Sequence, residues 1–362
     1  MKRLSRLSMS LVLCVLEMLC ISSAAYATTY VYASNYASNT VTAYPINTTT
    51  STATYTISGL NGPTGVAVDS NYVYVANSGS TTVTIYPIHT TTSTATYTIS
   101  GLTEPYGVAV DSNYVYVADA GGTTVKAYPI DTTTSTATYT ISGLSYPAGV
   151  AVDSSYVYVS DWIAATVTEY PIHTTTSTAT YTISGLTEPY GVAVDSNYVY
   201  VADAGGTTVK AYPIDTTTST ATYTISGLSY PAGVAVDSSY VYVSDWIAAT
   251  VTEYPIHTTT STATYTISGL TSPTNVAVNS SYVYVSDIGT DTVKAYPIDT
   301  TTSTATYTIS SLNTPYGVAL LATTATTTSV PLMTDVGRFI FIFFAGLGGT
   351  YAIIRAKGRV NV

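Results

Sequence analysis

The 362-residue sequence predicts an all-β fold, a seven-bladed β-propeller of 42-residue, four-stranded blades. One observation is a repeat: the pentapeptide Gly-Val-Ala-Val-Asp or a variant of it recurs every 42 residues, starting at Gly65, Gly107, Gly149, Gly191, Gly233, Asn275 and Gly317. The other is composition: 36 Tyr and only 8% charged residues exclude coiled coils and disordered chains. Four short strands in about 40 residues are typical of one propeller blade.

Within the unit that starts at Gly107, turn sequences such as Asp-Ser-Asn separate four β-rich runs. The expected strands span residues 108–110, 114–118, 124–130 and 137–142. The second run alternates Tyr and Val without charge, so we expect both of its faces to be buried between neighbouring blades. The first run, Val-Ala-Val after a glycine, has small side chains, as expected where the blades come close together at the propeller axis. The hydroxyls of the Thr-Ser-Thr-Ala-Thr run are expected to hydrate the outer edge.

The phase of the repeat predicts how the ring closes. After residues 1–27, which are interpreted below as a signal peptide, the repeat region begins on a second strand, residues 30–34, and it ends on a lone first strand, residues 317–321. An open solenoid would instead need distinct polar caps. We therefore expect residues 28–322 to form one ring whose seventh blade combines strands from both ends.

The pattern Gly-Val-Ala-Val-Asp-Ser-Asn-Tyr-Val-Tyr-Val-Ala-Asp resembles the NHL and YVTN families of β-propeller repeats over residues 29–321. These families include adhesins, extracellular sensor domains, lyases and lactonases. The resemblance therefore implies the fold and leaves the function open.

The N-terminal residues 1–27 read as a signal peptide, with basic residues, an apolar run and small residues before a cleavage point after Ala27. Both cysteines, Cys14 and Cys20, lie in this segment, so the mature chain is expected to have no disulfide and no cysteine-based site.

The C-terminal region follows a Thr-rich linker, residues 323–329. Residues 330–362 contain a short motif, sixteen uncharged residues at 339–354 and a basic tail, which predicts a transmembrane helix and a cytoplasmic end. This ending resembles the IPTL-CTERM sorting signal of Gram-negative exported proteins, with Pro331, Asp335 and Gly337 in register. The alternative is a plain membrane anchor. We expect export across the inner membrane, followed by anchoring, cell-surface display or release; whether the segment is cleaved stays open.

Charge restricts the partners. Between the basic ends the chain carries only three Lys against eighteen carboxylates, a net charge of −15, which excludes nucleic acid as a binding partner.

One mostly acidic series of residues lies at the ends of the expected inner strands: Asp69, Asp111, Asp153, Asp195, Asp237, Asn279 and Leu321. It is interpreted as a turn device, with a Ca²⁺-binding ring as the alternative. A second series closes the second strands and is also interpreted as a turn device: Asn35, Asn77, Asp119, Asp161, Asp203, Asp245 and Asp287.

Catalysis on a propeller requires unlike residues that converge on the axis. Residues 86–187 recur unchanged as 170–271, so the blades are near copies. The three histidines, His89, His173 and His257, occupy equivalent peripheral positions and are interpreted as solvated loop residues. We therefore predict a monomeric, non-catalytic binding or structural surface module for adhesion or matrix association, without catalytic residues, cofactor or metal site. The alternative is a metal-dependent enzyme of the lactonase or lyase type.

The blades differ most in the loops before the inner strands and after the second strands. The candidate binding residues there are Glu104, Tyr106, Tyr146, Trp162, Glu188, Tyr190, Tyr230 and Trp246. Aromatic rings beside carboxylates suit a glycan, an extracellular polymer or a protein ligand. The alternative is that the two tryptophans fold down as hydrophobic lids.

Charged residues of the third strands suggest ion pairs between blades. Lys126, Lys210 and Lys294 alternate around the ring with Glu169 and Glu253. Because adjacent strand positions face opposite sides, the sequence predicts that each Lys faces a Glu of a neighbouring blade.

Overall fold

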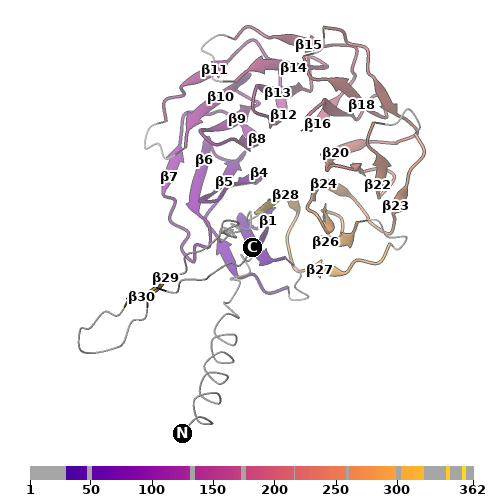
Figure 1. Cartoon of the computed structure of the whole chain (residues 1–362). Helices are drawn as coiled ribbons and strands as arrows, with labels where there is room; N and C mark the ends of the chain where they lie inside the picture. Colours follow the sequence, from indigo (N-terminus) through magenta and orange to yellow (C-terminus); the bar gives the residue numbers. More distant parts are fainter. Residues whose placement is uncertain are drawn as a thin grey trace, which may run out of the picture. The chain divides into compact units, whose positions relative to one another are not determined.

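The structure, a computed structural model, describes residues 30–46, 51–130, 135–172, 177–215, 217–257, 261–298, 303–321, 340–342 and 353–355. The chain divides into two units, Met1–Thr323 and Thr324–Val362. The first unit consists of seven four-stranded antiparallel sheets arranged around one axis (Figure 1). The predicted seven-bladed propeller is therefore confirmed.

In six of the sheets the strands run outward from the axis in chain order, and in the seventh β28 lies innermost, followed by β1, β2 and β3. The inner strands are β4 (Pro63–Val68), β8 (Pro105–Val110), β12 (Pro147–Val152), β16 (Pro189–Val194), β20 (Pro231–Val236), β24 (Pro273–Val278) and β28 (Pro315–Leu321). The second strands are β5 (Tyr72–Asn77), β9 (Tyr114–Asp119), β13 (Tyr156–Asp161), β17 (Tyr198–Asp203), β21 (Tyr240–Asp245), β25 (Tyr282–Asp287) and β1 (Tyr30–Asn35). The third strands are β6 (Thr82–Pro87), β10 (Thr124–Pro129), β14 (Thr166–Pro171), β18 (Thr208–Pro213), β22 (Thr250–Pro255), β26 (Thr292–Pro297) and β2 (Thr40–Pro45). The outer strands are β7 (Tyr97–Ile99), β11 (Tyr139–Ile141), β15 (Tyr181–Ile183), β19 (Tyr223–Ile225), β23 (Tyr265–Ile267), β27 (Tyr307–Ile309) and β3 (Tyr55–Ile57). Blades 1 to 6 begin at β4, β8, β12, β16, β20 and β24, and blade 7 begins at β28.

Blade 7 closes the ring as predicted. Its sheet has the order β28-β1-β2-β3, and Tyr30 pairs with Leu321 across the junction of the two ends. Closure in this way pairs the axis-facing edge of the N-terminal strand β1 with the C-terminal strand β28, so that edge of β1 is not left open.

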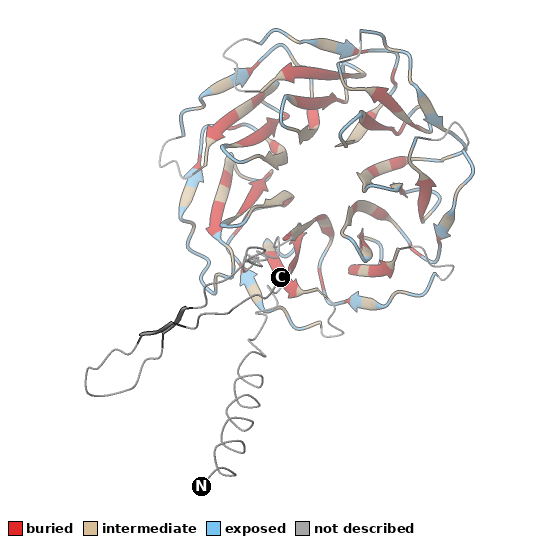
Figure 2. Ribbon diagram, viewed as in Figure 1, coloured by how far each residue is buried: buried red, intermediate tan, exposed pale blue. Residues whose placement is uncertain are grey.

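The core lies between the blades. Figure 2 shows the buried residues concentrated on the second and third strands, while each outer strand has an exposed Thr at its centre. Tyr74 and Val73, which point to opposite faces of β5, are both fully buried. This confirms the expectation that the Tyr-Val runs are packed on both faces.

The inner strand begins at Pro105 in blade 2, three residues before the expected start. Its pairing with β9 shifts register between Pro105 and Val108, so the strand bulges at Gly107. A Cβ on Gly107 would lie 2.4 Å from the backbone oxygen of Ala148 in the next blade. Glycine is therefore required here because neighbouring backbones approach closely.

The outer strand is shorter than expected, since it covers only residues 139–141 in blade 2. The preceding Thr-Ser-Thr-Ala-Thr run links blades as well as facing solvent: Ser135 Oγ accepts a bond from Ser100 N, 2.9 Å away, in the preceding blade. The same bond recurs at every blade junction and includes Ser310 N to Ser51 Oγ, 3.0 Å, at the closure.

The predicted Lys–Glu pairs between blades are wrong. Lys126, Lys210 and Lys294 each pair with the buried aspartate of their own blade, Asp119, Asp203 and Asp287, at 3.0, 3.0 and 3.2 Å. Asp119 pairs in register with Thr124, so Lys126, two residues along the same face, reaches it diagonally within the sheet. That distance is shorter than the roughly 10 Å between packed sheets.

The second unit contains the antiparallel pair β29 (Ile340–Ile342) and β30 (Ile353–Arg355). The rest of the predicted transmembrane segment, the sorting motif, the linker and the signal peptide lie outside the described residues and stay predictions. In the described part of the chain, no helix has the length and apolar character needed to span a membrane.

Candidate functional site

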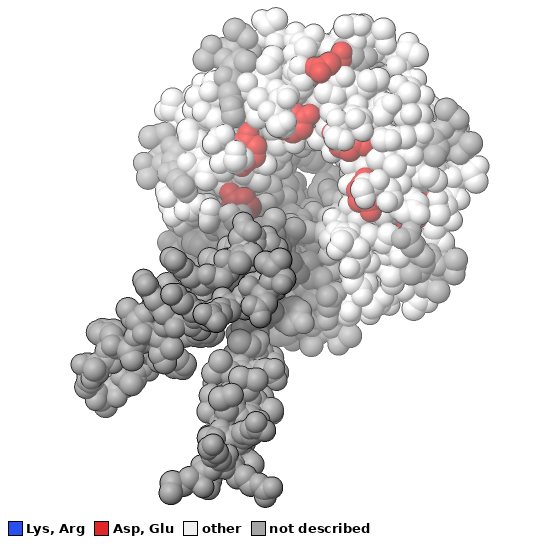
Figure 3. All heavy atoms as spheres, viewed as in Figure 1, with Lys and Arg blue, Asp and Glu red and all other residues white. Residues whose placement is uncertain are grey.

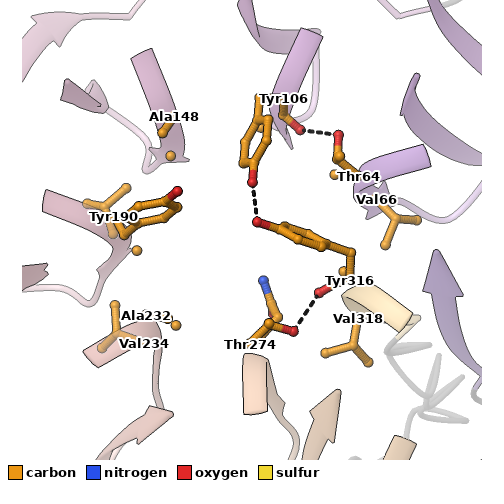
Figure 4. A pocket seen from close by; sticks show the side chains of 18 of the residues that line it. Thr64, Val66, Tyr106, Ala148, Tyr190, Ala232, Val234, Thr274, Tyr316 and Val318 are labelled. Atoms are coloured by element: carbon orange, nitrogen blue, oxygen red, sulfur yellow. Dashed lines mark hydrogen bonds between the residues drawn. The ribbon is translucent and has the colours of Figure 1, made fainter. Parts of the chain in front are cut away.

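A cavity of about 390 Å³ lies on the propeller axis, where the inner strands converge (Figure 4). The second residue of each inner strand lines it: Thr64, Tyr106, Ala148, Tyr190, Ala232, Thr274 and Tyr316 in blades 1 to 7. Tyr230, Trp246 and Ile288, from the loops of blades 5 and 6, complete one side. Every lining residue is uncharged at neutral pH, and the volume is within the range of small-molecule sites.

Three tyrosines converge inside the cavity. Tyr106 and Tyr316 share a hydrogen bond between their hydroxyls, and their rings meet edge to face with centroids 5.8 Å apart. Tyr190 extends toward them from the other side (Figure 4). Burial, and next the neighbouring Tyr316, raises the pKa of both Tyr106 and Tyr190. These side chains therefore keep their protons and offer neutral hydroxyl donors and acceptors.

Two equivalent aromatic clusters stand beside the cavity. In the first, the Tyr146 hydroxyl donates to Glu104 Oε1 at 3.1 Å, and the Tyr146 and Trp162 rings lie 5.7 Å apart. In the second, Tyr230 donates to Glu188 Oε2 at 3.4 Å, and the Tyr230 and Trp246 rings are also 5.7 Å apart. We call them the Trp162 cluster and the Trp246 cluster. Burial, and then Glu104, raises the pKa of Tyr146 to about 12.

The two clusters form because antiparallel pairing brings their loops together. Pro147 pairs with Asp161 at the end of the blade 3 sheet, so the residue before the inner strand lies beside the residue after the second strand. The backbone N–H of Trp162 then donates to the carbonyl of Tyr146 at 3.0 Å, and Trp246 bonds Tyr230 in the same way.

The clusters differ in exposure. Trp162 is half-buried, its ring lies 6.1 Å from that of Tyr190 in the next blade, and its Nε1 is buried without a partner among the described groups. Trp246 is 42% exposed and lines the cavity, and Thr274 occupies the position equivalent to Tyr190. Trp162 thus resembles the predicted lid, whereas Trp246 offers an accessible ring.

The eight predicted site residues all lie in this region: two sets of three in the clusters, and Tyr106 and Tyr190 in the cavity. The sequence interpretation missed Tyr316 and Thr274. The signal that would have found them is the residue after the proline of each inner strand, which varies while its neighbours repeat.

The first aspartate series is confirmed as a turn device. Asp69 Oδ1 accepts from the backbone N–H of Asn71 and Tyr72, both at 2.7 Å, and Oδ2 accepts from the Tyr74 hydroxyl at 2.7 Å. Asp111, Asp153, Asp195 and Asp237 make equivalent bonds. No group of His, Cys, Asp or Glu able to hold a metal ion occurs within the described ranges.

Asn279 keeps the turn but lacks the second carboxylate oxygen to which the equivalent tyrosine hydroxyls donate, so the buried Tyr284 hydroxyl has no such acceptor. Replacing Asn279 with Asp should supply the missing acceptor and raise the free energy of unfolding by about 1 kcal/mol. Urea denaturation would measure this gain. The reverse change, Asp237→Asn, should cost a similar amount, and a loss of stability in Asn279→Asp would contradict the account.

The second series also caps loops. Asp119 accepts from the backbone N–H groups of Thr103 and Glu104 at 2.7 and 2.9 Å, and so anchors the loop that carries Glu104. In blades 3 and 5, where no Lys is present on that face, a backbone N–H of Ala164 or Ala248 is the third donor.

The described histidines, His89 and His257, are exposed, as predicted for loop residues. His257 lies over Tyr198, with ring centroids 4.9 Å apart, and its Nε2 is 3.5 Å from Asp195 Oδ2. His173 lies outside the described residues.

No protein-family model matches the chain, and no curated protein matches its sequence. Solved structures with a similar fold include a functionally unknown protein from Desulfotomaculum acetoxidans, 14% identical, with a TM-score of 0.68 over 81% of this chain and 98% of that one. A protein from Bacteroides fragilis named "putative 6-phosphogluconolactonase" is 14% identical, with a TM-score of 0.68 over 82% and 99%. The WD40 propeller domain of Doa1 is 15% identical, with a TM-score of 0.60 over 72% and 87%. At these identities the similarity establishes the β-propeller fold alone.

Proposed function

We propose that this chain is an exported, cell-envelope-associated propeller of the NHL/YVTN type that binds a neutral glycan and has no catalytic role. The predicted signal peptide and sorting segment support export and envelope association. The single observation that carries the binding role is the exposed Trp246 ring at the edge of an uncharged cavity lined by tyrosine hydroxyls.

The chemistry of the site favours a saccharide over charged ligands. Aromatic ring faces are electron-rich and attract the weakly positive C–H groups of a sugar ring, while the hydroxyls and Glu188 suit sugar hydroxyls. Figure 3 shows Asp and Glu in an arc around the central opening of one face, with no Lys or Arg visible on that face. Such a surface repels polyanions. A cation would lack a carboxylate in the cavity lining.

Replacing Trp246 with Ala should weaken binding of cellohexaose or maltoheptaose by roughly tenfold or more and leave the melting temperature nearly unchanged. Isothermal titration of the full chain, in a detergent without a sugar headgroup, would measure the affinity. Trp162→Ala is the matched control: we expect a lower melting temperature, because Trp162 packs on Tyr146 and Tyr190. Intact binding by Trp246→Ala would contradict the proposal.

The enzyme alternative makes a different prediction. A lactonase- or lyase-type propeller would retain a stoichiometric divalent metal after dialysis, which mass spectrometry would detect. Under the proposed function we expect none.

A further inference from the structure

The two aromatic clusters lie in two copies of one duplicated sequence, yet each contacts a different residue of the next blade. Residues 86–187 and 170–271 are identical, so Trp162 and Trp246 share the same local sequence. The first differences that reach the rings come after the duplication, where Tyr190 of blade 4 corresponds to Thr274 of blade 6. Tyr190 packs against Trp162, whereas Thr274 leaves Trp246 exposed beside the cavity.

The order of residues around the axis also indicates that the space beside Trp246 is open. Tyr106, Tyr190 and Tyr316 project into the cavity, and Ala148 lies alone between two of them (Figure 4). On the other side, Ala232 and Thr274 are consecutive small residues in blades 5 and 6. Trp246 comes from blade 5, so the exposed tryptophan stands in the sector where two consecutive small residues separate the tyrosines.

We infer that Thr274 opens a single saccharide-binding subsite at the Trp246 cluster, and that Tyr190 closes the equivalent subsite at the Trp162 cluster. This inference rests on the proposed function for the class of its ligand. One sugar ring lies on Trp246, within reach of Glu188, and the chain end enters the cavity over Ala232 and Thr274. There the hydroxyls of Tyr190 and Tyr316 hydrogen-bond the terminal sugar.

Two features support an end-on mode and a stoichiometry of one. The cavity of about 390 Å³ is confined by seven inner strands, so it accepts a chain end more readily than the middle of a polymer. Only the Trp246 cluster among the two combines an exposed ring with contact to that cavity. A repeat protein with two equivalent open clusters would bind two.

The test exchanges the two residues. Thr274→Tyr should cover Trp246, and Tyr190→Thr should uncover Trp162. Acrylamide quenching in single-tryptophan backgrounds, Trp162→Phe and Trp246→Phe, reports each exposure without any ligand. We expect Thr274→Tyr to reduce quenching of Trp246 several-fold and to weaken cellohexaose or maltoheptaose binding at least tenfold, while Thr274→Ser leaves both unchanged.

The readouts separate the two claims. Unchanged quenching of Trp246 in Thr274→Tyr would overturn the inference that this position opens the subsite. Quenching that changes as expected, with no binding of either oligosaccharide by the unmodified chain, would overturn the saccharide proposal and leave the geometry standing. Binding of tetramethylammonium in place of the oligosaccharides would assign the site to organic cations and also overturn the saccharide proposal. A stoichiometry of two in the unmodified chain would contradict the single subsite.

Discussion

Replacing Asp119 with Ala is expected to lower the free energy of unfolding by about 3–5 kcal/mol. The carboxylate is fully buried and accepts two backbone N–H groups as well as the ammonium of Lys126 at 3.0 Å. The change leaves a largely buried cation and two buried amides without their acceptor. Denaturant unfolding of the full chain would measure the loss.

Asp161→Ala is the matched control for this prediction. Asp161 is equally buried but accepts only backbone N–H groups, from Ser145, Tyr146 and Ala164. Its removal leaves no cation unpaired, so the loss should be smaller. Equal losses in the two variants would show that the Lys126–Asp119 pair contributes nothing specific.

Replacing Glu169 with Gln should stabilise the protein at pH 8 by about 2–3 kcal/mol and have little effect at pH 4. Glu169 is 3% exposed and its Oε1 has no hydrogen-bond partner among the described residues. Burial, and then the carboxylates of Asp215 and Asp153, raises its pKa from 4.5 to about 7. The Tyr156 and Tyr158 hydroxyls donate to those aspartates and not to Glu169.

The direction of this pH dependence of stability follows from proton binding by Glu169. Between pH 4.5 and 7 the folded state holds a proton on Glu169 that the unfolded chain has released, so stability falls as the pH rises through this window. Above pH 7 Glu169 is ionised in both states, so the loss of stability is complete and no longer changes with pH. Glutamine stays neutral throughout, so the two melting-temperature curves should separate above about pH 4.5. The same difference at pH 4 and pH 8 would rule out a buried titrating carboxyl.

The ring and its closure could be predicted because they depend on period and phase. The strand fragments at Tyr30 and Gly317 complement each other in the sequence, and no side-chain detail is needed to join them. The turn role of Asp69 was equally predictable, since an aspartate before Ser-Asn bonds its own turn.

The ion pairs and the difference between the tryptophans could not be predicted in the same way. The alternation of side chains along a strand predicts the face of the sheet to which Lys126 points. It does not predict which carboxylate on that face is nearest, because Lys126 extends diagonally to Asp119 on the neighbouring strand of its own blade. Trp162 and Trp246 have identical local sequences, and their exposure depends on Tyr190 and Thr274 in the adjacent blades.

The most direct test of the central claim is a fluorescence titration of Trp246. The chain has two tryptophans, so Trp162→Phe leaves Trp246 as the sole reporter. Titration with cellohexaose or maltoheptaose should give a saturable blue shift with one site per chain, because a sugar ring that covers the indole removes water from it. Saccharide binding that leaves the Trp246 emission unchanged, or no binding at all, would contradict the account.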